Sequence, residues 1–246
     1  MRTLNVHLLP SHVAPDELAG RHVVVIDVLR ATTTICHALV AGAKQIIPRE
    51  DIAQARATAE KFDSGEVLLG GEREGIRIDG FDLGNSPRDY RAETVGGKTI
   101  VFTTTNGTRA IARAVQAEAI LIGALNNVAA IAKYLESAQH VSILCAGTQG
   151  NISAEDVFAA GAIANELQGA ASDQTMGNTW STNDEARIAL SVYGDGTQAM
   201  QVLRESRGGQ NLIRLKYHAD IEVAAQFNAL EVVPRMQAEG AITANE

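Results

Sequence analysis

Aromatic residues and cysteines are scarce in this chain of 246 residues. Phe, Trp and Tyr together make up 4% of the sequence, too few for a platform on which nucleic-acid bases stack. The two cysteines, Cys36 and Cys145, cannot build a disulfide framework and suit a reducing, cytoplasmic environment. Lys and Arg number 21 against 29 Asp and Glu, a net charge of −8. This balance argues against a nucleic-acid partner and against binding to an anionic membrane surface.

Long apolar runs are also missing. No stretch approaches the roughly 18 residues that span a bilayer. Residues 1–10 hold a short apolar patch interrupted by Asn5 and His7, which predicts a leading β-strand rather than a signal peptide. Apolar residues nevertheless make up 46% of the chain, enough for a sizeable core.

A short apolar run, a polar cluster and a helical pattern follow one another three times. The apolar runs are residues 22–26, 99–102 and 141–145. Near-continuous Val and Ile indicate strands buried on both faces, as in a parallel sheet under helices. We therefore expect an α/β fold with three α/β/α layers, a mainly parallel or mixed sheet and a helical C-terminal third. Helices are expected over residues 33–40, 51–62, 108–116, 127–138 and 184–192, with another ending near residue 167.

The length suits one large domain or two lobes that share a site. We expect a single domain over residues 1–240, and the alternative is a pair of lobes over about 1–168 and 184–240. The small, polar segment 169–183 is the candidate linker between them. Residues 241–246 are expected to form a frayed tail.

The clearest candidate ligand site is the segment TTTNGT at residues 103–108. It follows a buried strand and opens a helix, where free N–H groups and the helix dipole favour an anion such as phosphate. The alternative is an N-cap cluster in which one Thr caps the helix. The residues expected to bind substrate here are Thr104, Thr105, Asn106, Gly107 and Thr108.

Acidic side chains accompany two of the predicted strand ends. Asp27 ends the first buried strand, with Arg30 close behind. We expect Asp27 to be a Mg²⁺ ligand or a nucleophile and Arg30 to bind phosphate; the alternative is a structural Asp27–Arg30 pair. Glu155 and Asp156 follow the third strand and are expected to complete the Mg²⁺ site, although Asp156 also has the spacing of a helix cap.

A Gly-rich, charged segment between the first two units supplies three further candidates. Arg73 is expected to clamp a second anion, or else to be a solvated surface side chain. Asn85 and Ser86 are expected to line the pocket, or else to build the turn before Pro87.

Five motifs in order resemble the 2-phosphosulfolactate phosphatase family: residues 25–35 (VIDVLRATTTI), 70–73 (GGER), 80–87 (GFDLGNSP), 103–108 (TTTNGT), and 145–147 (CAG) together with Ser153, Glu155 and Asp156. The resemblance implies an α/β/α sandwich and a Mg²⁺-dependent phosphatase. The implied reaction converts 2-phospho-3-sulfolactate into 3-sulfolactate and phosphate, a step towards coenzyme M. Family positions correspond to Asp27, Arg30, the 103–108 loop, Glu155 and Asp156. The sequence departs from the family pattern at residues 216–218 and at Asn228.

Two alternatives to this function follow from the same residues. One is a phosphometabolite-binding protein without turnover, and the other is a phosphatase of the same fold that acts on a different phosphorylated hydroxy acid. The expected partner is a small phosphorylated molecule, with neither nucleic acid nor membrane involved. A homodimer is the default assembly of a cytoplasmic enzyme.

Overall fold

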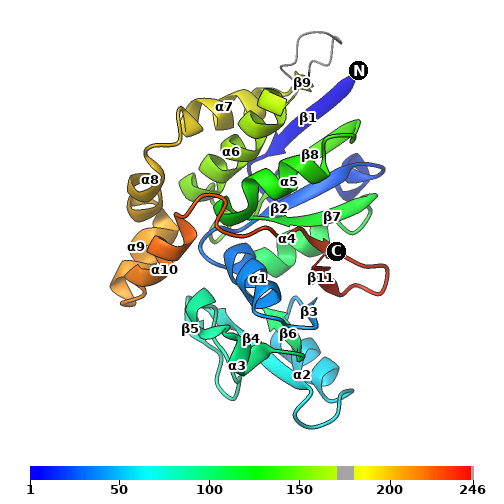
Figure 1. The fold of residues 1–246 in the computed structure, drawn as a ribbon, viewed down its shortest axis with the longest axis vertical. Helices are drawn as coiled ribbons and strands as arrows, with labels where there is room; N and C mark the ends of the chain where they lie inside the picture. Colours follow the sequence, from blue (N-terminus) through cyan, green and yellow to red (C-terminus); the bar gives the residue numbers. More distant parts are fainter. Residues whose placement is uncertain (171–179, 245–246) are drawn as a thin grey trace.

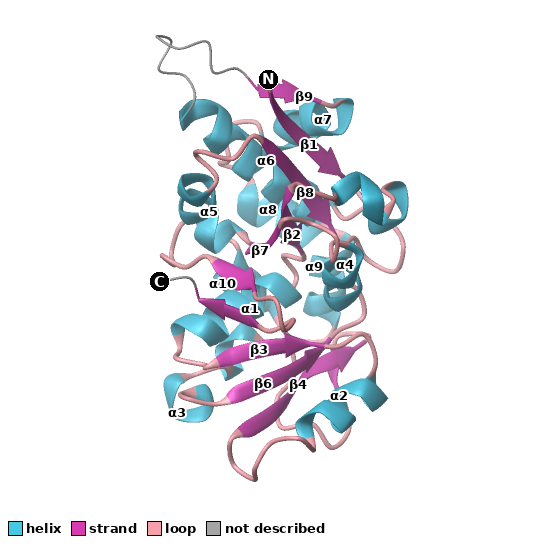
Figure 2. Ribbon diagram, turned by 90° about the vertical axis from the view of Figure 1, so that its right-hand side faces the viewer, coloured by secondary structure: helices cyan, strands magenta, loops and turns pink. Residues whose placement is uncertain are grey.

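The computed structural model describes residues 1–170 and 180–244 as an α/β fold built on one mixed sheet (Figures 1 and 2). The strand order is β5-β4-β6-β3-β11-β10-β7-β2-β8-β1-β9. The strands are β1 (Arg2–His7), β2 (His22–Ile26), β3 (Gln45–Pro48), β4 (Val67–Arg73), β5 (Ile76–Arg77), β6 (Thr99–Thr103), β7 (Ala119–Gly123), β8 (His140–Cys145), β9 (Trp180–Thr182), β10 (Pro234–Met236) and β11 (Ile242–Ala244). The expected fold class is confirmed.

Helices lie on both sides of the strands in Figure 2. They are α1 (Ala31–Val40), α2 (Ile52–Ala59), α3 (Ala92–Val95), α4 (Gly107–Arg113), α5 (Val128–Tyr134), α6 (Ala154–Ala170), α7 (Asp184–Tyr193), α8 (Ala199–Glu205), α9 (Arg207–Arg214) and α10 (His218–Ala224). Each expected helix is present, and several are shorter than expected, because local pattern marks helix ends poorly. None of the described helices is long and apolar enough to cross a membrane.

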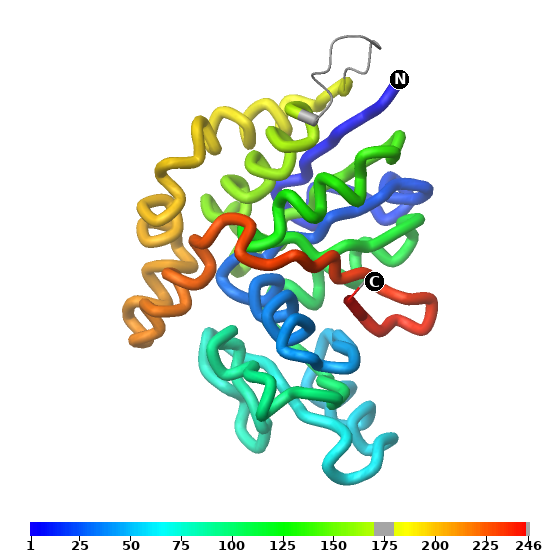
Figure 3. The backbone as a smooth tube through the Cα atoms, in the orientation of Figure 1, coloured from blue at the N-terminus to red at the C-terminus, as the bar shows by residue number. Residues whose placement is uncertain are grey.

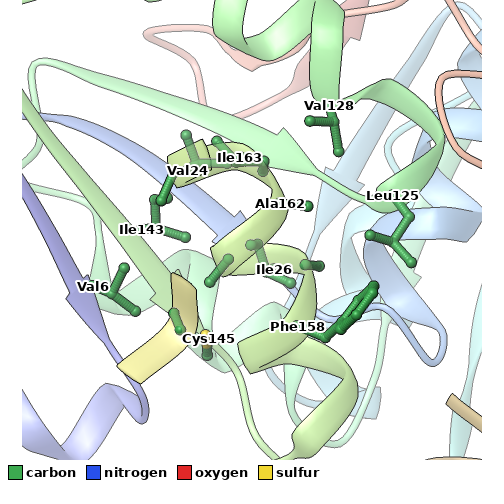
Figure 4. Packing of buried hydrophobic residues seen from close by; sticks show 14 of the residues in the cluster. Val6, Val24, Ile26, Leu125, Val128, Ile143, Cys145, Phe158, Ala162 and Ile163 are labelled. Atoms are coloured by element: carbon green, nitrogen blue, oxygen red, sulfur yellow. The ribbon is translucent and has the colours of Figure 1, made fainter. Parts of the chain in front are cut away.

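Strand β2 shows how the sheet divides the core. Val24 and Ile26 pack into one buried cluster with α5 and α6 (Figure 4), whereas Val23 and Val25 pack into another with α1 and α4. Successive side chains of a strand point to opposite faces. A continuous apolar run is therefore needed to fill both layers, as the sequence pattern predicted.

The C-terminal hairpin lies in the middle of the sheet rather than at its edge. β10 and β11 pair with each other and join β7 to β3, all in antiparallel fashion. The red end of the tube in Figure 3 shows this path. The expectation of a frayed tail over residues 241–246 is thus wrong for Ile242–Ala244, and Ile242 is fully buried. Three residues are too few to show a strand pattern, so this strand is specified by its neighbours.

Most of the candidate linker, residues 171–179, lies outside the described residues. The described residues on either side of this range belong to a helix and a strand rather than to a linker. α6 continues to Ala170, and Trp180–Thr182 forms β9, which pairs in parallel with β1. β10, which belongs to the second of the alternative lobes, pairs with β7 of the first, so strands from both lobes lie in one sheet.

Candidate functional site

A pocket opens where several segments converge beyond the carboxyl ends of the parallel strands, the usual ligand position in such sheets. The loops after β2, β6 and β8 meet the β4–β5 hairpin and α9. The C-terminal helices approach that hairpin beside α1 in Figure 3. We call this the site pocket. Its lining comprises Asp27, Leu29, Arg30, Glu72, Glu74, Gly75, Asn85, Thr105, Asn106, Thr148, Gln149, Gly208, Asn211 and Leu212.

Asp27 lies on the pocket wall and is 7% exposed. Its Oδ1 accepts the N–H of Ala31 at 3.2 Å, and its backbone is bracketed by the Thr32 hydroxyl. The pKa of Asp27 is raised to about 7, chiefly by burial and also by the charges of Glu72 and Glu155, against the opposing effects of the Ala31 N–H and the Arg30 charge. The carboxyl group is therefore held in place, but its hydrogen bond does not make up for the water that its charged form loses on burial.

Glu155, in the first turn of α6, lies behind Gly208 and outside the pocket lining. The pKa of its carboxyl group is raised chiefly by burial, and the neighbouring Ser206 hydroxyl and Gly208 N–H oppose that rise. A Cβ atom at Gly208 would collide with Glu155 Oε1, so glycine lets α9 approach the acid. Glu155 Oε2 is buried and accepts no hydrogen bond within the described part of the chain.

Asp156 joins two of the loops. Its Oδ1 accepts the N–H of Val28 and its Oδ2 accepts the N–H of Gly147, both at 2.9 Å. These bonds fasten the loop after β2 to the loop after β8. Burial, Glu155 and Asp27 raise its pKa, while the two N–H donors lower it.

Within residues 1–170 and 180–244, no group of three or more His, Cys, Asp or Glu side chains is arranged to hold a metal ion. The charge of Glu155 contributes to the raised pKa of Asp27, so the two expected ligands interact, and the Oε2 atom of Glu155 accepts no hydrogen bond among the described residues. Mg²⁺ in phosphate chemistry commonly takes one or two carboxylates together with substrate oxygens. The two side chains fit that requirement.

Arg30 is 3% exposed and its ion-pair partner is Asp220 of α10, not Asp27. Its Nη1 donates to Asp220 Oδ2 at 2.7 Å, and its Nη2 donates to the carbonyl of Gly75 at 2.9 Å. The Tyr217 ring lies 4.5 Å from the guanidinium carbon. Sequence reasoning missed Asp220, because an acid in a helical segment is usually solvated.

Two residues of the GFDLGNSP segment surround this ion pair. Ser86 Oγ donates to Asp220 Oδ1 at 2.8 Å, so Ser86 supports the pocket wall from outside the lining. Asn85 does line the pocket, and its Oδ1 is buried without a partner among the described residues.

The residues of the loop 103–108 have different roles: some stabilise the start of a helix and others line the pocket. Thr104 and Thr108 bond reciprocally at the start of α4, whose N-cap residue, Asn106, makes no capping hydrogen bond through its side chain. Thr105 and Asn106 line the pocket. A Cβ atom at Gly107 would lie 2.5 Å from Ala31 Cβ and 2.8 Å from Asp27 Oδ2. Glycine is therefore needed where this loop meets the loop after β2.

Sequence reasoning did not single out Glu72, yet its carboxylate binds the loop that was expected to bind an anionic ligand. It is 7% exposed and accepts the N–H groups of Thr105 at 2.8 Å and Gly75 at 2.6 Å. The neighbouring Arg73 lies outside the pocket and donates to Thr103 Oγ1 at 2.9 Å. Adjacent strand residues point to opposite faces, so only one of the two could face the pocket.

The fold and the pocket define a class of protein: an α/β protein with a polar, acid-containing ligand site at the carboxyl edge of a largely parallel sheet. The family described as 2-phosphosulpholactate phosphatase matches residues 7–239. The chain belongs to that family, whose members are phosphoric monoester hydrolases.

Several relatives match almost end to end, and each is described as a probable 2-phosphosulfolactate phosphatase. One from Symbiobacterium thermophilum is 42% identical over 222 residues, 89% of this chain and 92% of the relative. Those from Deinococcus radiodurans and Caldanaerobacter subterraneus subsp. tengcongensis are 39% and 37% identical, covering 95% and 90% of this chain and 92% and 90% of theirs.

Proposed function

We propose that this protein hydrolyses 2-phospho-3-sulfolactate to 3-sulfolactate and phosphate, in the manner of coenzyme M biosynthesis, and that Mg²⁺ is its cofactor. The proposal is supported by family membership and by one observation above all. Asp27 and Glu155 are both buried carboxyl groups with raised pKa values, and the charge of Glu155 adds to the rise at Asp27, which lines the pocket. Buried acids with perturbed pKa values cluster at functional sites, and a cation would offset the cost of their burial.

Asp27 and Glu155 are the residues that would hold Mg²⁺, and the ion would supply positive charge to the phosphate oxygens. Asp156 keeps the loops after β2 and β8 together, which fixes the spacing of the two ligands. Arg30, with N–H groups left over after its bonds to Asp220 and Gly75, faces the same pocket. Thr105 and Asn106 provide polar groups on the opposite wall.

Hydrolysis of a phosphate monoester depends on positioning and charge neutralisation more than on covalent machinery. A water oxygen bonds to phosphorus, the bond between phosphorus and the substrate's C2 oxygen breaks, and that oxygen leaves as an alkoxide that takes up the proton lost by the attacking water. Buried, hydrogen-bonded walls of this kind hold the phosphate in one orientation and limit access of bulk water.

The test is release of inorganic phosphate from 2-phospho-3-sulfolactate, measured before and after EDTA treatment and again after Mg²⁺ is restored. We expect activity to vanish with EDTA and to return with Mg²⁺. Phospholactate, which lacks only the sulfonate, is the matched substrate control and should be hydrolysed more slowly. Asp27→Asn and Glu155→Gln should each lower kcat by about 10²-fold or more.

Each part of the proposal can fail separately. Equal rates on the two substrates would contradict the sulfonated substrate, and activity that survives EDTA would contradict the metal. Tight binding of the phosphate ester without phosphate release would favour the non-catalytic binding protein instead.

A further inference from the structure

A second hollow adjoins the site pocket on the outside of α9. It is lined by Thr148, Gln149, Arg207, Gln210, Asn211 and Arg214. Three of these residues, Thr148, Gln149 and Asn211, also line the site pocket. The two hollows are therefore adjacent, and we call the outer one the rim groove.

Two guanidinium groups flank the rim groove. Arg207 and Arg214 are seven residues apart, two helical turns, so they lie on one face of α9 with Asn211 between them. Both are exposed. Arg214 Nη2 donates to Asn211 Oδ1 at 2.6 Å, which directs this arginine along the groove.

These arginines differ from other arginines of the C-terminal helices in having no acidic partner. Neither forms an ion pair with any residue in the described ranges, whereas Arg204, just before α9, lies 3.6 Å from Glu222. An exposed arginine without an acidic partner keeps its full field toward solvent.

The site pocket has several acidic side chains in its lining, so a positive field beside it would help an anionic substrate to approach. The lining contains Asp27, Glu72 and Glu74, and its cation, Arg30, is already paired with Asp220. The whole chain carries a net charge of −8. A phosphorylated, sulfonated carboxylic acid approaching this protein therefore meets repulsion unless a local positive field guides it.

We infer that Arg207 and Arg214 form a cationic rim that captures the polyanionic substrate and guides it into the site pocket. This inference rests on the proposed function for the identity of the substrate. The two arginines act on the encounter between enzyme and substrate, so they contribute to kcat/KM and leave the chemical step alone.

The experiment compares Arg207→Gln, Arg214→Gln and the double variant with the unaltered enzyme on 2-phospho-3-sulfolactate, with Mg²⁺ present. At low salt we expect the double variant to lose about tenfold in kcat/KM, with kcat unchanged. The loss should disappear near 1 M salt, where the screening length falls to about 3 Å. Arg207→Lys with Arg214→Lys should restore most of the rate, because the charge is restored.

Lys133→Gln is the matched control for each single variant, since this exposed lysine lines a different hollow and its replacement removes the same single positive charge. A loss in both single variants no larger than in Lys133→Gln, or a loss in the double variant that persists at high salt, would overturn the inference. A fall in kcat would do the same.

A second measurement does not depend on hydrolysis. Calorimetric titration with inorganic pyrophosphate at low salt should show binding to the unaltered protein that weakens several-fold in the double variant. If pyrophosphate binds the two proteins equally, or binds neither, the rim is refuted. Weakened pyrophosphate binding in a protein that hydrolyses no phosphosulfolactate would refute the proposed substrate alone.

Discussion

Asp27 directly follows the buried strand β2 and lines the site pocket, and its side chain is almost fully buried. Its pKa rises from 3.8 to about 7 by burial, with Glu72 and Glu155 adding to the rise. Between these values the folded protein binds a proton that the unfolded chain does not. The stability contributed by that proton is fully present below pH 3.8 and is lost as the pH rises through about 7.

We predict that Asp27→Asn raises the Tm of the metal-free protein by roughly 5 °C near pH 8.5. The amide has no charge to desolvate, and its NH₂ group can donate to the neighbouring carboxylates. The gain should shrink near pH 5, where Asp27 is protonated in the folded protein. Calorimetric melting in EDTA at both pH values checks this, and a lower Tm for Asp27→Asn near pH 8.5 would contradict the account.

Asp156→Asn is the matched control, with the opposite expected sign. Both oxygens of Asp156 accept backbone N–H groups, so an amide must turn its own NH₂ toward one of those donors. We predict a loss of about 1–3 kcal/mol in the free energy of unfolding at both pH values, measured by urea denaturation. A stability equal to that of the unaltered protein would show that the two loops are fastened by other contacts.

Helix α10 brings the C-terminal third of the chain to the site. Asp220 is 1% exposed and bonds both Arg30 and Ser86, so one carboxylate holds two walls of the pocket together. Glu222, two residues later, forms only an exposed ion pair with Arg204 at 3.6 Å. The helix therefore contains one buried acid that joins two pocket walls and one acid in an exposed ion pair.

We predict that Asp220→Asn costs about 3 kcal/mol of stability and raises KM, because it leaves the buried Arg30 guanidinium without a counter-charge. Glu222→Gln should cost less than about 1 kcal/mol and leave KM unchanged. Urea denaturation and steady-state kinetics on the two variants provide the comparison. Similar effects from both substitutions would mean that the Arg30–Asp220 pair does not organise the pocket.

The elements that sequence alone predicts are those whose pattern is local. The Val and Ile run of β2 indicates a strand that is buried on both faces, and the Thr-rich segment is followed directly by a helical pattern. Both elements could therefore be predicted from the sequence. The choice between Glu72 and Arg73 depends on which face of β4 each occupies, which only the pairing of β4 settles. Asp220 likewise depends on how α10 packs, and its own segment gives no sign of a buried partner.

At the scale of the whole molecule, the hairpin β10–β11 connects two groups of strands. β4, β6 and β3 lie on one side of it, and β7, β2, β8, β1 and β9 lie on the other. The pocket draws Glu72 and Thr105 from the first group and Asp27 from the second. The last strand of the chain thus fixes the spacing of residues that are far from it.

We predict that Ile242→Ala, at the start of β11, lowers the free energy of unfolding by about 2–4 kcal/mol. Ile242 is fully buried and pairs opposite Ile46, so the cavity would open at the junction of the two strand groups. The same substitution at Ile188, which is 50% exposed on α7, should cost less than about 1 kcal/mol. Urea denaturation measures both, and kcat/KM should fall for Ile242→Ala because the two walls of the pocket separate more easily. Equal stability of the two variants would place the C-terminal strand outside the cooperative fold, and an unchanged kcat/KM would show that the walls are held without it.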